Sequence, residues 1–206
     1  MVLAQCEVGP LMNTRYLAKR TLKNIFLMLM LPLYLFYRAI SLIGNQDSAF
    51  QSCSQTLSLI PGKIGVYTRA AFYRLSCPGT SDDISVGFLT VFSHWDTTIK
   101  EGVYIGPQCN IGSCEIGPNT LLGSGVHVLS GKNQHVFSDL NKPIKQQGGD
   151  YTKVKIQGDC WIGNSSIVMT DLPQRVVVAA GSIVITSPGS KSVIAGNPAK
   201  TIKSQI

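Results

Sequence analysis

The sequence is poor in histidine and in acidic residues. Only three of its 206 residues are histidine, and 11 aspartates and glutamates stand against 18 lysines and arginines, which gives a formal net charge of +7. This excess predicts an acidic partner, such as a phosphate-bearing ligand, an anionic membrane surface or an anionic saccharide. Nucleic acid is not expected as a partner, because the basic residues are dispersed and form no recognised nucleic-acid motif.

Cysteines spaced for metal or redox chemistry are also absent. The six cysteines are Cys6, Cys53, Cys77, Cys109, Cys114 and Cys160. No two of them have the spacing of a zinc-ligand pair or of a CxxC motif, so no metal is expected. We expect all six thiols to be reduced, as is usual in the cytosol.

The sequence lacks an apolar run of comfortable transmembrane length. The run from Ile25 to Tyr37 is interrupted by Pro32 and ended by Arg38, and such a short run is more often a core helix or an interfacial segment. Basic residues precede it at Arg15, Lys19, Arg20 and Lys23. A signal peptide is not expected, because no small-x-small cleavage site is evident.

This apolar segment predicts a kinked helix that lies in or dips into the membrane, with its basic flank on the anionic cytoplasmic face. Tyr34 and Tyr37 suit the membrane interface. Apolar side chains surround the whole helix rather than forming one stripe. The alternative is a helix that packs within an oligomer, away from lipid. The expected location is therefore cytoplasmic and peripheral, at the inner face of the cell membrane.

Two further segments complete the N-terminal region. Residues Gly44 to Gln55 are polar and serine-rich, which predicts a connector. Residues Lys63 to Leu75 follow a Pro-Gly break with apolar residues at steps of three and four, which predicts a helix. Arg69 and Arg74 fall off that apolar stripe, so we expect them on a solvated face, with contacts to phosphate as the alternative.

The most informative pattern is a six-residue period of branched aliphatic residues. Its first run is Ile99, Ile105, Ile111, Ile116, Leu122 and Val128, and its second is Ile156, Ile162 and Val168. Neither an amphipathic helix nor an alternating strand has this period. It is typical of a parallel β-helix. The pattern continues through Val86, Phe92, Leu172, Val178 and Val184.

In such a solenoid, three hexapeptides make one triangular coil with the first position of each pointing inward. Glycine or asparagine suits the tight corners. We expect an all-β solenoid of roughly four coils over residues 81–206, a helical, membrane-associated region over residues 1–80 and a loop insertion over residues 130–153. The flat faces and open end of stacked coils predict an oligomer.

The insertion between Val128 and Ile156 is polar, and its Gly148-Gly149 pair is a candidate hinge. Long loops on rigid repeats are favoured places for function. The one side chain of this loop that titrates near neutral pH is His135, which makes it a candidate catalytic residue.

The stretch GVHVLSGKNQH…KVKIQGDCWIGNSSIVM…AAGSIV…VIAGNPAK resembles the hexapeptide-repeat O-acetyltransferases. These include the maltose, nodulation-factor and xenobiotic acetyltransferases, and the match covers about Ser85 to Lys203. The segment IPGKIGVYTRAAFYRL is similar to acetyltransferases encoded with exopolysaccharide or surface-glycan synthesis. The resemblance implies a left-handed coil, a homotrimer, acetyl-CoA as co-substrate and a loop histidine at the position of His135 as the catalytic residue.

The family also implies an acetyl-CoA groove between adjacent subunits. The residues that match it are Trp161, Gly163, Ala180, Gly181, Asn197, Pro198 and Lys200. In this likeness Trp161 and Gly163 border the pantetheine arm, and Lys200 lies near the CoA phosphates. The sequence departs from the family at Ser187-Pro188-Gly189, where a Lys-Asp pair is common, and Lys191 is a possible substitute.

The chemistry of the loop histidine follows from its side chain. A neutral imidazole at His135 can take the proton of an alcohol that attacks the thioester and pass it to the departing thiolate. Backbone N–H groups or a side-chain donor would stabilise the oxyanion, and no acyl-enzyme is required. His94 is a second catalytic candidate, either touching the acceptor or assisting His135, with a structural role as the alternative. His127 is expected at the surface or at an interface.

The sequence thus predicts an acetyl-CoA-dependent O-acetyltransferase that acts on a sugar hydroxyl of a glycan or lipid-linked polysaccharide precursor. Serine acetyltransferase-like or xenobiotic acetyltransferase activity is one alternative. A zinc carbonic anhydrase on the same solenoid would need His94, His127 and His135 to converge, and a non-catalytic trimeric scaffold is a further alternative.

Overall fold

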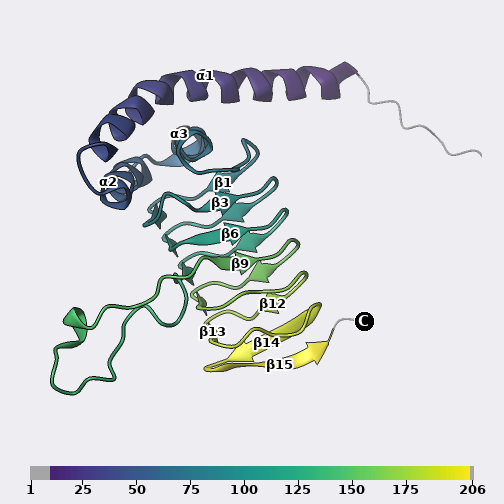
Figure 1. Cartoon of the computed structure of the whole chain (residues 1–206). Coiled ribbons are helices and arrows are strands. Elements are labelled where there is room, and N and C mark those ends of the chain that lie inside the picture. Colours follow the sequence, from purple (N-terminus) through teal and green to yellow (C-terminus); the bar gives the residue numbers. More distant parts are fainter. Residues whose placement is uncertain (1–9, 205–206) are drawn as a thin grey trace, which may run out of the picture.

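The computed structural model describes residues 10–204, so Cys6 lies outside the described residues, as does the side chain of Arg15. Three helices precede a parallel β-helix (Figure 1). They are α1 (Pro10–Ser41), α2 (Gln46–Ser58) and α3 (Gly62–Ser76). The helices gather at one end of the solenoid, and a long loop projects from its side (Figure 1).

Three sheets form the faces of the triangular solenoid. Face A consists of β1 (Ser85–Val86), β4 (Tyr104–Ile105), β7 (Leu121–Leu122), β10 (Trp161–Ile162), β12 (Val177–Val178) and β14 (Ser192–Gly196). Face B consists of β2 (Val91–Phe92), β5 (Asn110–Ile111), β8 (His127–Val128), β11 (Ile167–Val168) and β13 (Ile183–Val184). Face C consists of β3 (Thr98–Ile99), β6 (Cys114–Ile116) and β9 (Val154–Ile156). These strands pair in parallel, and β15 (Ala199–Ser204) closes face A antiparallel to β14.

The predicted ladder of inward side chains is confirmed. Each aliphatic or aromatic residue of the ladder from Val86 to Val184 is at most 1% exposed. They stack one coil above the next, as Ile105 on Leu122 and Leu122 on Ile162 show. Face B has five strands, one more coil than the roughly four expected. The ladder continues to Ile194, which follows Val184 by more than one hexapeptide and so breaks the period.

The corners use the left-handed backbone conformation more widely than expected. Gly102, Gly125 and Gly181 adopt it, but so do seven residues that are not glycine, including Leu89 and Gln108. This conformation costs an ordinary residue roughly 1–2 kcal/mol. The ladder supports it, because the N–H of Gln108 bonds to the carbonyl of Phe88 in the coil before, and other corners repeat this bond.

Side chains from the helical region cap the open end of the solenoid. The Ser54 hydroxyl of α2 accepts a hydrogen bond from the Phe92 N–H at 2.8 Å. Arg69 of α3 donates from Nε to the Val86 carbonyl at 3.0 Å. Thr80 Oγ1 accepts from the Ile99 N–H at 3.0 Å. An unpaired sheet edge would leave such groups unsatisfied or open to aggregation, so the helices complete the first coil.

Arg69 is therefore not on a solvated face, as the sequence predicted, but fully buried. Its Nη1 also donates to the carbonyls of Leu57 and Ile60, at 3.0 and 2.8 Å. Burial lowers the pKa of the Arg69 guanidinium. The prediction failed because the acceptors are backbone carbonyls distant in sequence. Arg74, in contrast, is exposed as expected.

The connector predicted over Gly44 to Gln55 is wrong, because the segment forms α2. Asn45 caps this helix by accepting from the Ser48 N–H at 2.9 Å. The sequence of α2 is dominated by serine and other polar residues, so its apolar stripe is sparse. Phe50 and Leu57 of this stripe are buried against the core. The second helix predicted over Lys63 to Leu75 is confirmed as α3.

Helix α1 is apolar on two sides. One stripe, including Met30, Leu33 and Tyr37, packs toward the core. The opposite side stays exposed and carries large apolar side chains, among them Met28 (67%) and Phe36 (61%). Pro32 lies inside the helix, and Figure 1 shows α1 bending toward α2. By length and composition alone, its stretch Tyr16–Ser41 could cross a bilayer.

Candidate functional site

The long loop leaves the solenoid after face B and returns to face C, with His135 near its base. Thr152 N–H bonds to the Ser130 carbonyl at 3.0 Å, and Asp150 N–H bonds to the Asn133 carbonyl at 2.8 Å. One step further, Val136 N–H bonds to the Gly148 carbonyl at 2.9 Å. These bonds join the two arms of the loop, and the exposed His135 lies on the outgoing arm. The base of the loop thus fixes the backbone of His135 and leaves its side chain accessible.

The two loop glycines have different roles. Gly148 has φ of +77° and no neighbour within 4 Å of a built Cβ, so this position requires the left-handed backbone conformation rather than close packing. At Gly149 a Cβ would lie 1.9 Å from the Gln134 carbonyl oxygen and 2.8 Å from the His135 nitrogen. Gly149 therefore lets the return arm lie directly against the peptide that precedes His135.

His94 lies at the corner between faces B and C and is held by a carboxylate. Its Nδ1 lies 3.1 Å from Asp47 Oδ2, while Asp47 Oδ1 accepts from the Trp95 N–H at 3.0 Å. An ionised carboxylate only accepts hydrogen bonds, so a neutral ring carries its proton on Nδ1 and has Nε2 available as an acceptor. The ring also lies beside Tyr151 of the loop, with centroids 5.7 Å apart. The structure thus brings His94 to the return arm of the loop.

Next to His94, a polar cluster ties the corner to the loop. Both carboxylate oxygens of Asp96 accept from Ser113 Oγ, at 3.0 and 2.9 Å. Lys153, the residue before β9, donates from Nζ to the Asp96 carbonyl and to Thr98 Oγ1. The cluster anchors the point at which the loop rejoins the solenoid.

The residues matched to the acetyl-CoA groove lie elsewhere, along face A and its corner with face B. Trp161 is 57% exposed on β10. Gly163 follows it at the corner, where a Cβ would lie 2.5 Å from the Ala180 nitrogen of the next coil. Gly181 follows Ala180 with φ of +70°. Because these residues have small or no side chains, the corner leaves space beside the exposed Trp161 indole.

The other matched residues lie at the end of face A. Asn197 and Pro198 form the turn between β14 and β15 and are joined by a cis peptide bond. Lys200 is exposed on β15. Trp161 and Lys200 belong to one sheet, three strands apart, which corresponds to about 14–15 Å. The register aligns Trp161 with Val177, Val193 and Lys203, whereas Lys200 lies opposite Ala195, two residues along β14 from Val193.

Within one chain the two groups of candidates are separated by face B. His94 and the loop of His135 lie at the corner after face B, and Gly163 and Ala180 lie at the corner before it. His127 projects from β8 on this face and is exposed, with Asn110 and Ile167 beside it. In the described part of the chain, no three histidine, cysteine or acidic side chains form a group that could hold a metal ion.

The sequence did not point to Asp47 as part of a candidate site. It lies in the first turn of α2, a helix that the sequence did not predict, and 47 positions separate it from His94. The available signal was the asparagine cap, Asn45 followed by Ser48. That signal indicates where the helix begins, but not which loop its first turn contacts.

None of the described cysteines is suited to act as a nucleophile. Cys77, Cys109, Cys114 and Cys160 are buried free thiols, and Cys53 is half-buried. Burial raises the pKa of all five, to about 12 for Cys77. Since the thiolate is the reactive form, residues 10–204 offer no cysteine prepared to carry an acyl group.

Residues 96–130, which include β3 to β8, match the family model described as bacterial transferase hexapeptide (six repeats). This match confirms the hexapeptide repeats that the sequence predicted for this segment. Among solved structures the chain is similar to a maltose O-acetyltransferase from Clostridium difficile 630, with 21% sequence identity and a TM-score of 0.64. That match covers 78% of this chain and 89% of the other.

A second solved structure is AntD, an N-acyltransferase from Bacillus cereus, in complex with dTDP and 3-hydroxybutyryl-CoA. Here the identity is 19%, the TM-score is 0.51, and the match covers 64% of this chain and 78% of the other. At these identities the likeness is one of fold. It confirms that the chain has the predicted left-handed parallel β-helix, with the helical region and the loop as additions.

Proposed function

We propose that this protein is an acetyl-CoA-dependent O-acetyltransferase. The observation that carries the proposal is the series formed by the exposed Trp161 on face A, the close-packed Gly163 and Ala180 at its corner, and the exposed Lys200 on β15 of the same sheet. A slender pantetheine arm fits beside small residues, and a lysine at the end supplies a point charge for phosphates. Both solved structures of similar fold are named as acyltransferases, which agrees with this use of the solenoid.

In the proposed mechanism His135 is the general base. Its imidazole takes the proton of the acceptor hydroxyl as the oxygen attacks the thioester carbonyl, and then delivers the proton to the CoA thiolate. The acyl group passes directly to the acceptor, in agreement with buried cysteines whose pKa values are raised. His94, with its Nε2 available, assists by orienting the acceptor or the loop, and Asp47 positions its ring.

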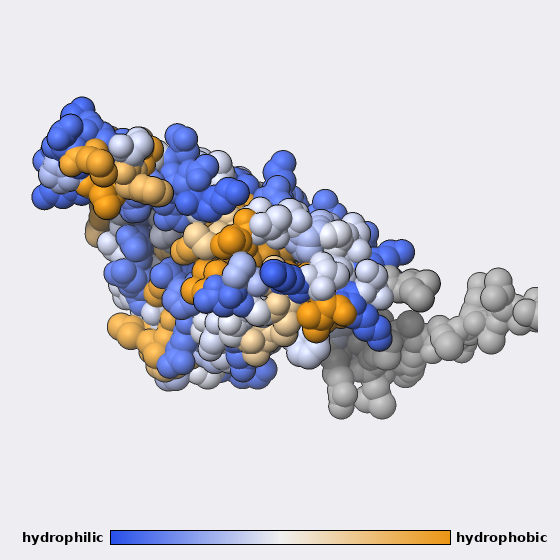
Figure 2. Space-filling model, turned by 90° about the horizontal axis from the view of Figure 1, so that it is seen from below, coloured by the Kyte–Doolittle hydropathy of each residue, from blue (hydrophilic) through white to orange (hydrophobic). Residues whose placement is uncertain are grey.

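The active enzyme is proposed to be a homotrimer, because one chain separates the two halves of the site. The loop that carries His135 exposes large apolar side chains, including Phe137 (73%) and Leu140 (96%). Figure 2 shows apolar surface on the lobe at the far left, where the loop projects in Figure 1. Face A exposes Tyr104, Leu121 and Trp161 in register. Docking the loop of one copy against the groove of another would bury both surfaces and complete the site.

The proposed acceptor is a sugar hydroxyl on a glycan or lipid-linked polysaccharide precursor at the inner face of the cell membrane. The exposed apolar side of α1 supports a membrane location, because a large exposed apolar patch marks an interaction surface. The maltose O-acetyltransferase of similar fold supports a saccharide acceptor. A serine or xenobiotic acetyltransferase would use the same groove, and only acceptor assays separate these possibilities.

Calorimetric titration of acetyl-CoA into the detergent-supported protein tests the proposal. We expect saturable binding near one site per chain, with a weaker affinity in Lys200→Ala. Lys155→Ala is the control, because it also removes one exposed lysine, but from face C, and it should leave the affinity unchanged. Absence of binding at millimolar acetyl-CoA would overturn the acyltransferase proposal in favour of a scaffold. Stoichiometric zinc in the purified protein would favour the carbonic anhydrase alternative.

A further inference from the structure

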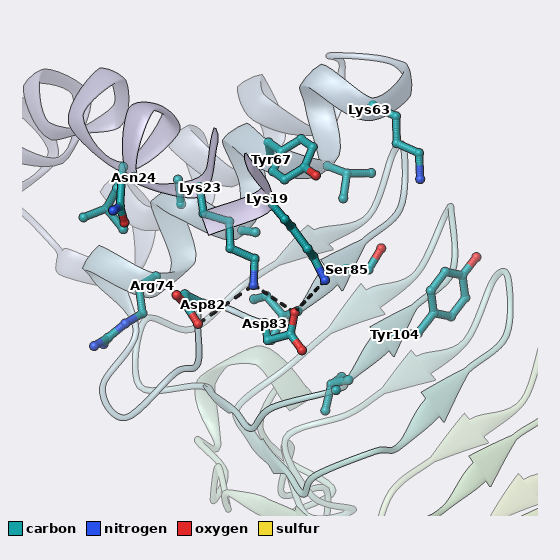
Figure 3. A pocket seen from close by; sticks show the side chains of 17 residues that line it. Lys19, Lys23, Asn24, Lys63, Tyr67, Arg74, Asp82, Asp83, Ser85 and Tyr104 are labelled. Carbon is teal, nitrogen blue, oxygen red and sulfur yellow. Dashed lines mark hydrogen bonds and ion pairs between the residues drawn. The ribbon is translucent and has the colours of Figure 1, made fainter. Parts of the chain in front are cut away.

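A cavity with charged and apolar lining lies far from the loop, between α1, α3 and the first strands of face A (Figure 3). Its volume is about 330 Å³. We call it the α1–α3 pocket and define it by Lys19, Lys23, Lys63, Arg74, Asp82 and Asp83. Tyr67 and Tyr104 also line it. The six defining residues do not belong to the candidate acyltransferase site, whereas Tyr104 is also part of the face A surface proposed above to contact another copy.

Positive charge is in excess in the α1–α3 pocket. Lys19 and Lys23 reach from α1 to Asp83 Oδ1, at 3.2 and 2.8 Å (Figure 3). The hydrogen bond from Lys23 lowers the pKa of the Asp83 carboxyl. Lys63 and Arg74 lie on opposite sides of the pocket, and neither forms an ion pair within residues 10–204. Two cations of the pocket are thus held in place by carboxylates, and two are available to a ligand.

Apolar surface borders this charge directly. Asn24 lines the pocket and also a shallow groove on α1 formed with Ile25, Met28 and Leu29. These three apolar residues are 50%, 67% and 58% exposed. A helix is about 10 Å across, and interfacial helices lie about 5–10 Å deep in the boundary between headgroups and acyl chains. If the outer side of α1 enters that boundary, the pocket beneath it lies at the level of the lipid phosphates.

We propose that the α1–α3 pocket binds the phosphate-bearing headgroup of an anionic membrane lipid, while Ile25, Met28 and Leu29 contact its acyl chains. The planar guanidinium of Arg74 suits a phosphate diester, and Lys63 adds a point charge. The hydroxyl of Tyr67 can donate to a headgroup oxygen. Because the cationic pocket lies beside an apolar groove, the site favours a ligand that has both an anionic headgroup and an apolar chain over a soluble anion. The inference rests on the membrane location in the proposed function, but not on acetyl transfer.

Vesicle co-sedimentation of the full-length protein tests this proposal. We expect strong binding to vesicles that contain phosphatidylglycerol and weak binding to pure phosphatidylcholine. The double variant Lys63→Gln/Arg74→Gln should bind the anionic vesicles roughly 30-fold more weakly. The control Lys145→Gln/Lys155→Gln removes the same charge from exposed positions away from α1 and should lose far less.

Three outcomes would overturn the proposal. Equal losses in the two double variants would mean unspecific attraction between a basic protein and an anionic surface. Equal binding of wild type to both kinds of vesicle would assign membrane contact to the apolar side of α1 alone. Saturable binding of inorganic phosphate or glycerol phosphate that competes with the vesicles at low millimolar concentration would identify a soluble phosphate as the ligand. Acetyl-CoA titration of both variants separates these failures from failure of the acyltransferase proposal.

Discussion

The carboxylate of Asp47 joins the helical region to the solenoid by accepting hydrogen bonds from the His94 ring and from the Trp95 backbone, at 3.1 and 3.0 Å. The first turn of α2 therefore fixes a side chain on the edge between faces B and C, from which the loop departs two coils later. Because the same ring lies against Tyr151, the orientation of His94 is coupled to the return arm of the loop.

Asp47→Asn should change the tautomer of His94 without unfolding the protein. The amide can still accept from the Trp95 N–H, but its NH₂ group then faces Nδ1, so the neutral ring is expected to carry its proton on Nε2. Nitrogen NMR of the histidine rings checks the tautomer. If His94 assists the reaction, acetyl transfer falls in the same variant. An unchanged tautomer would show that Asp47 does not position the ring in solution.

His135→Ala should abolish most acetyl transfer while leaving acetyl-CoA binding intact. A general base contributes roughly 100- to 10,000-fold to the rate, and His135 is exposed, so stability should not change. Turnover of acetyl-CoA with a saccharide acceptor, measured beside binding, separates the two effects. His127→Ala removes another exposed histidine and serves as the control. Similar losses in both variants would contradict a specific role for His135.

Gly163→Ala should destabilise the solenoid and narrow the proposed groove. The new Cβ would lie 2.5 Å from the Ala180 nitrogen, so the corner must shift. Overpacking of this kind costs about 1–3 kcal/mol of unfolding free energy. Gly189→Ala is the control, because nothing lies within 4 Å of its added Cβ. Urea denaturation compares the two variants, and equal stability would mean that the corner adapts without cost.

Arg69→Met should be the most destabilising of these substitutions. It removes the donor to three backbone carbonyls, those of Leu57, Ile60 and Val86, at a buried position. We expect a loss of about 3–5 kcal/mol in unfolding free energy. Arg74→Met changes an exposed arginine of the same helix and should have little effect on stability. Thermal and urea unfolding of both variants test whether the arginine caps the first coil.

Met28→Gln/Leu29→Gln should lower membrane recovery and leave the fold unchanged. Both side chains lie on the exposed side of α1 and do not contribute to the core. Deletion of the whole helix would be less informative, because it also removes the buried Tyr37. Flotation of the expressed protein with membranes measures the effect. Undiminished membrane recovery, with loss of oligomer by light scattering, would instead assign this side of α1 to contacts between subunits.

The solenoid could be predicted from the sequence because its signal is local and repeated. Each inward residue, such as Ile105 or Ile162, is followed six positions later by another, and stacking buries all of them. Helix α3 could be predicted for the same reason, since its apolar residues recur every three or four positions, which is a local pattern. The loop was visible as an interruption of the period, and His135 was visible as its one histidine.

Contacts between distant segments were decided only by the tertiary structure. The segment of α2 is rich in serine, and its apolar residues are too few to form a recognisable stripe. Burial of Phe50 and Leu57 against the core nevertheless stabilises the helix. Arg69 looked solvated because its partners are carbonyls of other elements, which no sequence pattern marks. The same holds for the Asp47–His94 pair and for the α1–α3 pocket. The sequence by itself determined the repeat and its core, because these depend on residue spacing. The helical cap, the corner histidine and the charged pocket depend on which segments fold against the first coil.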